Sequence, residues 1–584
     1  MAGIPEQRSP NDTGQHRRAD RLLVSTARRA PGWTALLIVT AGATSALALI
    51  RPAALAAALD AALTQQDVAA AVGEFTAVLG AIVLAGLAGQ LAEAYVTTGA
   101  TVWLRGRLVR HMLELGLLGQ RRFQPGDLVS RLTSGTAQMT GITPLLTQGV
   151  ARLATAIGGL VALLLIDVTL VLAMAVTVPL GLLLMRAFVR RTATATTRYL
   201  ELQGELSTRM VDALDGVRTI RAAGTLEREV RRVLVPAASL ADAGRTVWRG
   251  YGQASGQAAL LGPLTGLVTL ALAGYGVAAG RLTAGQLLAV TAYTSMALGL
   301  LDQTSLLLRL AQMRSAARRA AEVLATTSAP RGRRDLPPGP GALALEGVTF
   351  RAGNDVVLDR LDLRVPAGST VAIVGRSGAG KTTLAAVAGG LLPPDEGRVL
   401  LDGVPLHELD RPTLRRAVAY GFERPALMGS SIADLIGFGL DSPPPADIQR
   451  AARAAAADAF IRRLPHGYDT PPADAPLSGG EAQRLGLARA LARGGRLLIL
   501  DDAMSSLDTV TESQVAKALT VAAAGRTRLM VAHRASTAAR ADLVAWLDGG
   551  RIRLLAPHDQ LSADPGYRAI FESSTNGDRV EAPR

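Results

Sequence analysis

Residues 375–383 read Gly375-Arg376-Ser377-Gly378-Ala379-Gly380-Lys381-Thr382-Thr383 and match the phosphate-binding pattern G-x-x-x-x-G-K-[ST]. The apolar run 370–374 before this stretch predicts a buried strand, and the run 384–388 after it favours a helix. In such a unit the glycines let backbone N–H groups surround a phosphate chain, and the helix start adds partial positive charge. The chain has only two lysines against 60 arginines, which argues against the alternative of a glycine-rich turn beside a chance surface lysine. The stretch therefore predicts a nucleotide site in which Lys381 reaches the β- and γ-phosphates and Thr382 binds Mg²⁺.

The composition of the 584 residues is that of a membrane protein: 49% are hydrophobic and only 19% are charged. The net charge of +14 is compatible with nucleic acid, but aromatic residues make up only 3% and the arginines are spread along the chain, so no nucleic-acid partner is expected. The absence of cysteine excludes disulfides and thiolate metal sites. The basic start of the chain lacks the apolar core and cleavage site of a signal peptide, so we expect the N-terminus to stay in the cytoplasm.

Six apolar stretches are long enough to cross a bilayer. They lie at about 33–59, 75–103, 142–166, 168–188, 255–280 and 284–306. Asp167 alone separates the third stretch from the fourth, which predicts a very short turn. Arg51 is expected to extend from the first stretch to the membrane interface, with a substrate contact as the alternative.

The arginines between these stretches predict the orientation in the membrane. Arg281 is the only basic residue in the turns after the first, third and fifth stretches. The connection after the second stretch is basic, and so is the connection after the fourth, which covers about 186–249; the first of them contains Arg105, Arg107, Arg110, Arg121, Arg122 and Arg131. By the positive-inside rule, we expect both connections and both termini to lie in the cytoplasm. The protein is therefore expected to span the cytoplasmic membrane.

The two basic connections are predicted to be helical extensions of the spans. The stretches 123–132 and 210–221 contain glycines, Gly126 and Gly216, near the middle of each connection. We expect a turn at each glycine and a short crosswise helix that touches a cytoplasmic domain. The alternative is an ordinary polar loop.

The composition changes after the sixth stretch, where an arginine-rich helix at 309–325 is followed by residues dense in proline, glycine and arginine. Beyond them, short apolar runs alternate with helical patterns, as in an α/β domain. The predicted fold is an α-helical membrane domain with six transmembrane helices plus an α/β P-loop nucleotide-binding domain. The predicted organisation is a cytoplasmic segment at 1–32, the membrane domain with its cytoplasmic extensions at 33–325, a linker at 326–341, the nucleotide-binding domain at 342–573 and a tail at 574–584.

Further motifs follow the phosphate loop in the chain. The run 496–502 predicts a buried strand that ends in two carboxylates, of which Asp501 suits Mg²⁺ and Asp502 suits the orientation or deprotonation of an attacking water. The sequence Ser505-Ser506-Leu507-Asp508 follows directly. His533 comes after another apolar strand and is a candidate sensor of the γ-phosphate, although a lone histidine is more often structural.

A second candidate phosphate site lies at Leu477-Ser478-Gly479-Gly480-Glu481, which opens a helix predicted at 482–492. The Ser478 hydroxyl and the amides of the two glycines suit an anion at this helix start, so Ser478, Gly479, Gly480 and Glu481 are assigned to nucleotide binding. Taken alone, the segment is also explained as a serine cap with flexible glycines. Two such helix starts in one domain predict two half-sites that a second copy of the domain completes.

Together these motifs resemble those of an ATP-binding cassette (ABC) exporter half-transporter from about residue 17 to residue 573. The motifs GRSGAGKTT, LSGGE, LLILDD and SSLD, together with the His533 segment, carry the resemblance, and residues 126–131 resemble the first intracellular loop of such exporters. The resemblance implies that two nucleotide-binding domains enclose two ATP molecules with Mg²⁺, each between one P-loop and the opposite LSGGE. Domain closure then turns the spans from inward- to outward-facing, and hydrolysis resets them.

Three positions depart from the family pattern. Asp502 replaces the catalytic Glu and is one methylene shorter, and Glu423 stands where the family has a Gln that meets Mg²⁺ and water. Ala352 replaces the aromatic residue that stacks on adenine, a contact worth about 0.5–1.5 kcal/mol. For Asp502, a catalytic carboxylate misplaced by about 1 Å lowers the reaction rate roughly 10²-fold. Thus ATP binding is expected to persist, whereas hydrolysis at this chain's own P-loop, with Asp502, His533 and Glu423 as catalytic candidates, is expected to be weak.

The resemblance implies ATP-driven export of a small amphipathic molecule or peptide, with this chain as the degenerate-site subunit of a heterodimer. A homodimer, an importer of exporter architecture, and a slow-turnover regulatory or sensor subunit that binds ATP remain alternatives. A soluble ABC ATPase is excluded by the six apolar stretches. Polar residues in the spans are candidates either for a substrate cavity or for contacts between helices: Gln90, Glu93, Tyr293, Thr294 and Ser295.

Overall fold

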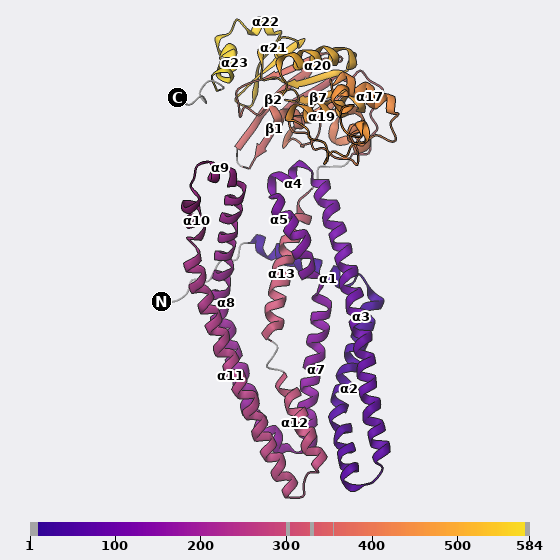
Figure 1. Cartoon of the computed structure of the whole chain (residues 1–584), viewed down its shortest axis with the longest axis vertical. Helices are drawn as coiled ribbons and strands as arrows, with labels where there is room; N and C mark the ends of the chain where they lie inside the picture. The colour runs from indigo at the N-terminus through magenta and orange to yellow at the C-terminus, as the bar shows by residue number, and fades with distance from the viewer. Residues whose placement is uncertain (1–9, 300–303, 328–331, 354, 578–584) are drawn as a thin grey trace. The chain divides into compact units, whose positions relative to one another are not determined.

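The computed structural model describes residues 10–299, 304–327, 332–353 and 355–577. The chain divides into two compact units (Figure 1). The first unit comprises Met1–Leu113 and Phe123–Thr326, and the second comprises Glu114–Arg122 and Thr327–Arg584. A short piece of the connection between two predicted spans thus belongs with the second unit.

The first unit is helical. Its helices in chain order are α1 (Pro10–Ala27), α2 (Pro31–Thr64), α3 (Val68–Leu115), α5 (Pro125–Ser130), a π-helical turn (Arg131–Gly135), α6 (Thr136–Thr140), α7 (Ile142–Ile166), α8 (Val168–Asp215), α9 (Val217–Ala222), α10 (Leu226–Leu234), α11 (Ala237–Ala278), α12 (Ala284–Leu298) and α13 (Thr304–Ala325). Figure 1 shows α8 and α11 running alongside each other, and α12 lying beside α7.

The predicted spans fall on α2, α3, α7, α8, α11 and α12. Within the described residues, three helical runs are long and apolar enough to cross a membrane, and a shorter apolar run lies at Gly262–Ala278; the three are Pro31–Thr64, Val68–Leu115 and Pro125–Ile166. The sixth predicted span, 284–306, is helical as far as Leu298, and residues 300–303 lie outside the described part of the chain.

The three arginine-poor turns of the first unit meet at one end of its helices. Asp167 forms the predicted one-residue turn, caps α8 by accepting a hydrogen bond from the Thr169 N–H at 2.9 Å, and pairs with Arg281 at 3.1 Å. The hydrogen bonds from Thr169 lower the pKa of Asp167. At the end of α2, the carboxylate of Asp60 accepts hydrogen bonds from the start of α12, including one of 2.8 Å from the Gly285 N–H. These contacts hold together turns that are distant in the sequence.

The turn predicted at Gly126 is wrong. Pro125 and Gly126 begin helix α5, where a proline at the first position is already preorganised for the helix. The chain turns instead at Gly116, whose φ of 53° lies in the left-handed region that glycine adopts without strain. The predicted turn at Gly216 is confirmed, since α8 ends at Asp215 and α9 begins one residue after Gly216.

The second unit contains two β-sheets. One is antiparallel with strand order β2-β1-β4-β5, and the other has the order β10-β9-β3-β8-β7-β6. The strands are β1 (Leu343–Ala352), β2 (Asp355–Val365), β3 (Thr370–Val374), β4 (Glu396–Leu401), β5 (Val404–Pro405), β6 (Val418–Phe422), β7 (Leu497–Asp501), β8 (Thr527–Val531), β9 (Leu543–Asp548) and β10 (Arg551–Ala556).

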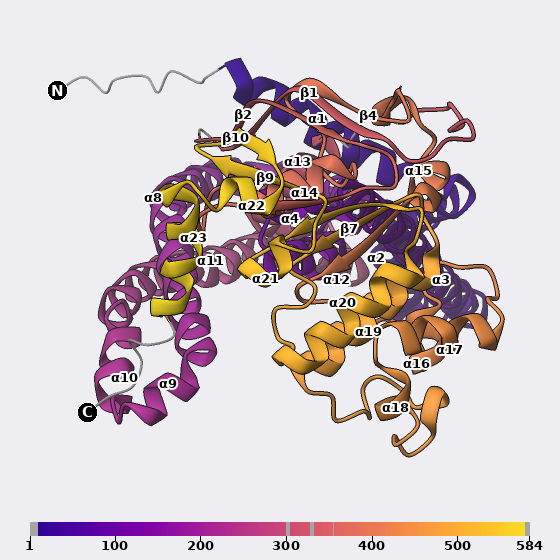
Figure 2. The same ribbon diagram turned by 90° about the horizontal axis from the view of Figure 1, so that it is seen from above.

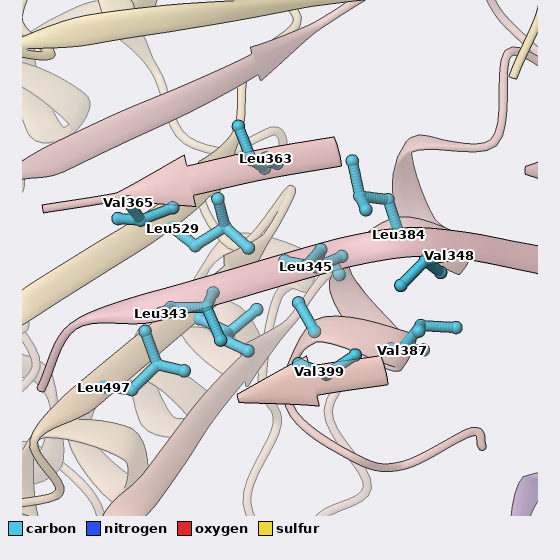
Figure 3. Packing of buried hydrophobic residues seen from close by; sticks show 14 of the residues in the cluster. Leu343, Leu345, Val348, Leu363, Val365, Leu384, Val387, Val399, Leu497 and Leu529 are labelled. Atoms are coloured by element: carbon cyan, nitrogen blue, oxygen red, sulfur yellow. The ribbon is translucent and has the colours of Figure 1, made fainter. Parts of the chain in front are cut away.

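Helices cover these sheets. They are α4 (Leu117–Arg122), α14 (Lys381–Ala388), α15 (Arg411–Ala417), α16 (Ile432–Ile436), α17 (Pro445–Ala454), α18 (Asp458–Ile461), α19 (Gly479–Arg493), α20 (Thr509–Ala522), α21 (Ala535–Ala538), α22 (His558–Leu561) and α23 (Pro565–Gly577). Figure 2 shows α16, α17 and α19 grouped in one subregion of this unit. A core of leucine and valine side chains joins both sheets to α14, and Figure 3 shows Leu345 and Leu384 in it.

The second sheet brings together the chain segments that carry the sequence motifs. Strands β3, β8, β7 and β6 are parallel neighbours, so their carboxyl ends meet at the same edge. The P-loop follows β3, His533 follows β8, Asp502 follows β7 and Glu423 follows β6. Ligands of open α/β sheets bind at this edge.

Candidate nucleotide-binding site

The P-loop wraps around the side chain of Lys381. Gly378 and Gly380 have φ values of 79° and 96°, which are left-handed conformations that favour glycine. The Lys381 ammonium donates hydrogen bonds to the carbonyls of Gly375 at 2.9 Å and Arg376 at 3.0 Å, and the residue is 6% exposed. Burial lowers the pKa of Lys381, while the charges of Asp502 and Asp501 act in the opposite direction. The loop thus holds one buried cation at the start of α14.

A threonine and an aspartate meet beside this lysine. The Thr382 hydroxyl donates a hydrogen bond of 3.1 Å to Oδ1 of Asp501, the last residue of β7. Burial raises the pKa of Asp501, and the hydrogen bond from Thr382 partly offsets that effect. A hydroxyl and a carboxylate are the oxygen ligands that Mg²⁺ prefers. A pair of this kind fits an ion that takes further ligands from phosphates and water.

Asp502 occupies the first position after β7 with φ = 53°, a left-handed conformation that aspartate tolerates better than most residues. Its backbone carbonyl accepts a hydrogen bond of 3.1 Å from the Ser505 hydroxyl. Its Oδ2 lies 4.0 Å from Nε2 of His533. Burial raises the pKa of Asp502, His533 opposes the shift and the charge of Glu423 adds to it. The structure therefore brings Asp502, His533 and Glu423 to one place.

Gln483 connects three of these segments and was not singled out from the sequence. Its side-chain amide donates to the Glu423 carbonyl at 2.9 Å and to the Ser505 hydroxyl at 3.0 Å, and it accepts from the Ser506 N–H at 2.9 Å. The residue is 3% exposed, so these bonds are shielded from water. The sequence around Gln483 on α19 does not indicate these contacts, because its partners follow two distant strands, β6 and β7.

The helix start at Ser478 is fixed by a capping box. Ser478 donates its N–H at 2.9 Å and its hydroxyl at 2.8 Å to the carboxylate of Glu481, and its hydroxyl oxygen accepts from the Glu481 N–H. Burial opposes the shift, but these hydrogen bonds lower the pKa of Glu481. The helix α19 begins at Gly479, three residues before the predicted start, so both glycine amides belong to its first turn. No hydrogen bond or ion pair joins residues 478–481 to the P-loop in the residues that the structure describes.

Arg121 on α4 is a further residue at the P-loop. Its guanidinium donates to the Thr383 hydroxyl at 3.4 Å and lies 5.0 Å from the ring centroid of Phe350. Arg411 holds the same segment by donating to the Glu114 carbonyl at 3.4 Å, and Leu117 packs against the leucine and valine core. The segment 114–122, which directly precedes the stretch 123–132 predicted to touch a cytoplasmic domain, thus belongs to this unit.

Comparison with known proteins identifies the class. Residues 358–505 match the ABC transporter family, and residues 34–301 match the ABC transporter transmembrane region. The chain is 45% identical over 546 residues to the ABC transporter ATP-binding protein RamA of Streptomyces coelicolor, covering 93% of this chain and 86% of the relative. It is 32% identical over 525 residues to an ATP-dependent lipid A-core flippase of Chromobacterium violaceum, covering 85% and 87%.

A solved structure agrees with these relatives. The fold matches that of a bacterial Atm1-family ABC exporter with ATP bound, with a TM-score of 0.77, 28% identity and coverage of 94% of this chain and 99% of that chain. The chain belongs to the ABC transporter family. It is an exporter-type half-transporter, with a helical transmembrane domain and one ATP-binding domain, and its activity is that of an ATP-driven transport ATPase.

Replacing Arg121 by alanine is expected to weaken ATP binding about fivefold. The guanidinium adds positive charge beside the P-loop, and the resemblance to ABC exporters implies that Ala352 replaces the aromatic ring that stacks on adenine. A cation next to a π face is worth about 1 kcal/mol. Titration of the full-length protein with a fluorescent ATP analogue measures the change. Arg110→Ala, which removes an arginine from α3 in the first unit, is the control, and equal affinities in both variants would assign Arg121 a packing role only.

Proposed function

We propose that this chain exports a small amphipathic molecule or peptide across the cytoplasmic membrane as the degenerate-site subunit of a heterodimer. The observation that supports this proposal most directly is Asp502, which follows the Walker-B strand beside a complete P-loop. Its side chain is one methylene shorter than the glutamate expected at this position. Its side chain reaches less far than glutamate, and its oxygen lies 4.0 Å from His533. This combination favours a site that binds ATP and turns it over slowly.

The residues at the sheet edge have distinct proposed roles at this site. The P-loop residues 375–383 bind the phosphates through their amides and Lys381, and Thr382 and Asp501 hold Mg²⁺. Glu423 takes the place of a neutral amide near the metal, where its carboxylate binds the ion but donates no hydrogen bond to water. Bound Mg²⁺ supplies charge neutralisation for the phosphoryl group. His533 orients the terminal phosphate, and Asp502 orients the attacking water.

The second proposed role is in the partner's site. The capped helix start at Ser478 presents the Gly479 and Gly480 amides, together with the positive end of a 15-residue helix, to an anion. Because this segment is intact while the P-loop side lacks its glutamate, we assign it to the completion of a hydrolysing site built on the other subunit's P-loop. In this arrangement, one of the two ATP sites drives turnover.

Substitution of Asp502 by glutamate is expected to increase the ATPase rate of the purified complex by about tenfold at this chain's own site. The added methylene restores reach, and a displacement of about 1 Å is worth roughly 10²-fold in rate. The left-handed φ of 53°, which suits aspartate better, limits the gain. The rate is measured with the partner's own catalytic residue inactivated, so that only this site contributes.

Asp502→Asn is the matched control because it keeps the size of the side chain and removes its charge. In the complex with an intact partner, it is expected to change the ATPase rate by less than about twofold, because the proposed hydrolysing site uses the partner's P-loop. A complete loss of activity in Asp502→Asn would make Asp502 an active catalytic base and would contradict the proposed asymmetry. An unchanged rate in Asp502→Glu would also weaken it.

A further inference from the structure

A cavity of about 600 Å³ opens between α2, α7 and α12 of the transmembrane domain. Its lining residues recur at helical spacing on one face of α2 and one face of α7; they are Ala41, Thr44, Ser45 and Ala48 on α2, Gln148, Ala151, Arg152 and Thr155 on α7, and Met296 and Gly299 after them in the chain. Pockets that bind small ligands span about 300–1,000 Å³. The cavity therefore has the size of a ligand site.

Close packing ends this cavity on one side. A Cβ atom at Gly158 would lie 2.4 Å from Leu49 of α2, and one at Gly159 would lie 3.0 Å from the Tyr293 carbonyl of α12. The Tyr293 hydroxyl donates to the Leu49 carbonyl at 2.8 Å, which joins α12 to α2 at the same level. Small residues let helices approach in a membrane. The three helices thus touch at the two glycines, and Arg152 lies about two turns earlier on α7.

Arg152 provides the charge in the cavity. It is 14 residues from the end of α7 at Ile166, or about 21 Å along the helix, which places it inside a hydrocarbon layer about 30 Å thick when Ile166 is at the edge. Its guanidinium forms no hydrogen bond or ion pair with any residue that the structure describes. A cation inside a membrane is costly and points to a functional partner. Among the residues that the structure describes, none supplies that partner.

The hydroxyl groups around Arg152 have already used their protons. Ser45 donates to the Ala151 carbonyl at 3.2 Å, Thr155 donates to the same carbonyl at 2.9 Å, and Thr44 donates to Ala41 at 3.0 Å. Each hydroxyl oxygen keeps lone pairs that accept hydrogen bonds. The cavity therefore offers donors at Arg152 and acceptors at the hydroxyls.

Gln148 lies one turn before Arg152 on α7 and is held from the side by α3. Its Nε2 donates to Oε2 of Glu93 at 2.9 Å. The amide oxygen of Gln148 is a further acceptor at the cavity wall, and the Glu93 carboxylate behind it disfavours a second anion there. The arrangement suits a ligand with one anionic group and adjacent N–H groups.

We propose that this cavity binds a carboxylate of an amphipathic peptide, with Arg152 as its charge partner and the hydroxyl oxygens as acceptors for neighbouring peptide N–H groups. The inference rests on the proposed export function and adds the chemical class of the cargo. A peptide supplies a carboxylate and amide donors together, whereas the phosphate of a lipid lacks the adjacent amide donors. Arg152, which the sequence did not single out, becomes the specificity residue of the cavity.

The test measures binding to the nucleotide-free complex in nanodiscs of phosphatidylcholine. The probes are a short fluorescent amphipathic peptide with a free carboxyl terminus and the same peptide with a terminal amide. The wild-type complex is expected to bind the carboxylate form at least about tenfold more tightly, because a charge-assisted hydrogen bond is lost in the amide. Arg152→Gln is expected to remove this difference, and Arg152→Lys to keep part of it.

Arg51→Gln is the matched control, since Arg51 lies on α2 outside the cavity lining, and it is expected to keep the full preference for the carboxylate. The same preference in Arg152→Gln would overturn the proposal, as would tight binding of dodecyl phosphate without binding of either peptide. Unchanged melting temperature establishes that each variant is folded. The basal ATPase rate of the wild-type complex, measured on the same discs, separates a failure of the proposed export function from a failure of this cavity.

Discussion

Gly479→Glu is expected to reduce the ATPase rate of the assembled transporter by about 100-fold. Gly479 is the first residue of α19, and a Cβ atom there meets no atom within 4 Å, so the domain accommodates the new side chain without internal strain. In the dimer, the bulk and negative charge oppose a phosphate at a helix start that favours anions. A displacement of about 1 Å in a reacting group already costs roughly 10²-fold.

The control for this variant is ATP binding at the chain's own P-loop, which Gly479→Glu is expected to leave within about twofold of the wild type, as for surface substitutions. Gly480→Ala is less suitable, because its Cβ would lie 3.1 Å from the Ser506 carbonyl and would combine strain with any effect on the partner. An ATPase rate near the wild-type value in Gly479→Glu would mean that this helix start completes no hydrolysing site.

Lys381→Ala is expected to weaken ATP binding at this chain's P-loop by about 100-fold. The substitution removes the one buried ammonium, which is held by the Gly375 and Arg376 carbonyls and is proposed to bind the β- and γ-phosphates. Loss of a charge-assisted hydrogen bond to a charged group costs about 1.5–3 kcal/mol, which is about 10- to 150-fold in affinity. Titration of the complex with a fluorescent ATP analogue resolves the two sites.

Lys517→Ala provides a matched control, because Lys517 is the only other lysine and is exposed on α20. It is expected to leave both ATP sites unchanged. The ATPase rate of Lys381→Ala is expected to fall less than its ATP affinity, since the proposed hydrolysing site uses the partner's P-loop. Two sites that remain intact in Lys381→Ala would contradict the assignment of the loop.

The sequence predicted those parts of the structure that local patterns determine. The strand 370–374 and the P-loop were predicted correctly, because an apolar β-branched run, a glycine pattern and a helix former agree over a short stretch. Parallel strands then bring Asp501, His533 and Glu423 to one edge, as their positions after strands indicated. The turn at Gly126 was wrong because a proline before it starts a helix.

The residues that sequence reasoning missed act across long separations. Arg121 is 262 positions from Thr383, and Gln483 is 60 positions from Glu423, so no local spacing links either pair. Three of the polar residues considered for a cavity make contacts between helices: Glu93 accepts from Gln148, Tyr293 donates to Leu49, and Thr294 donates to Thr269 at 3.4 Å. Arg152 is one of 60 arginines and lies in no sequence motif, so only the cavity around it distinguishes it.

The most direct test of the central claim is the native mass of the complex, with its subunits identified, after purification of the tagged full-length chain from its own cells in mild detergent. The account predicts one copy of this chain together with a second, different half-transporter that carries the catalytic glutamate. A complex of twice 60.6 kDa that contains only this chain would contradict it, because both sites would then depend on Asp502.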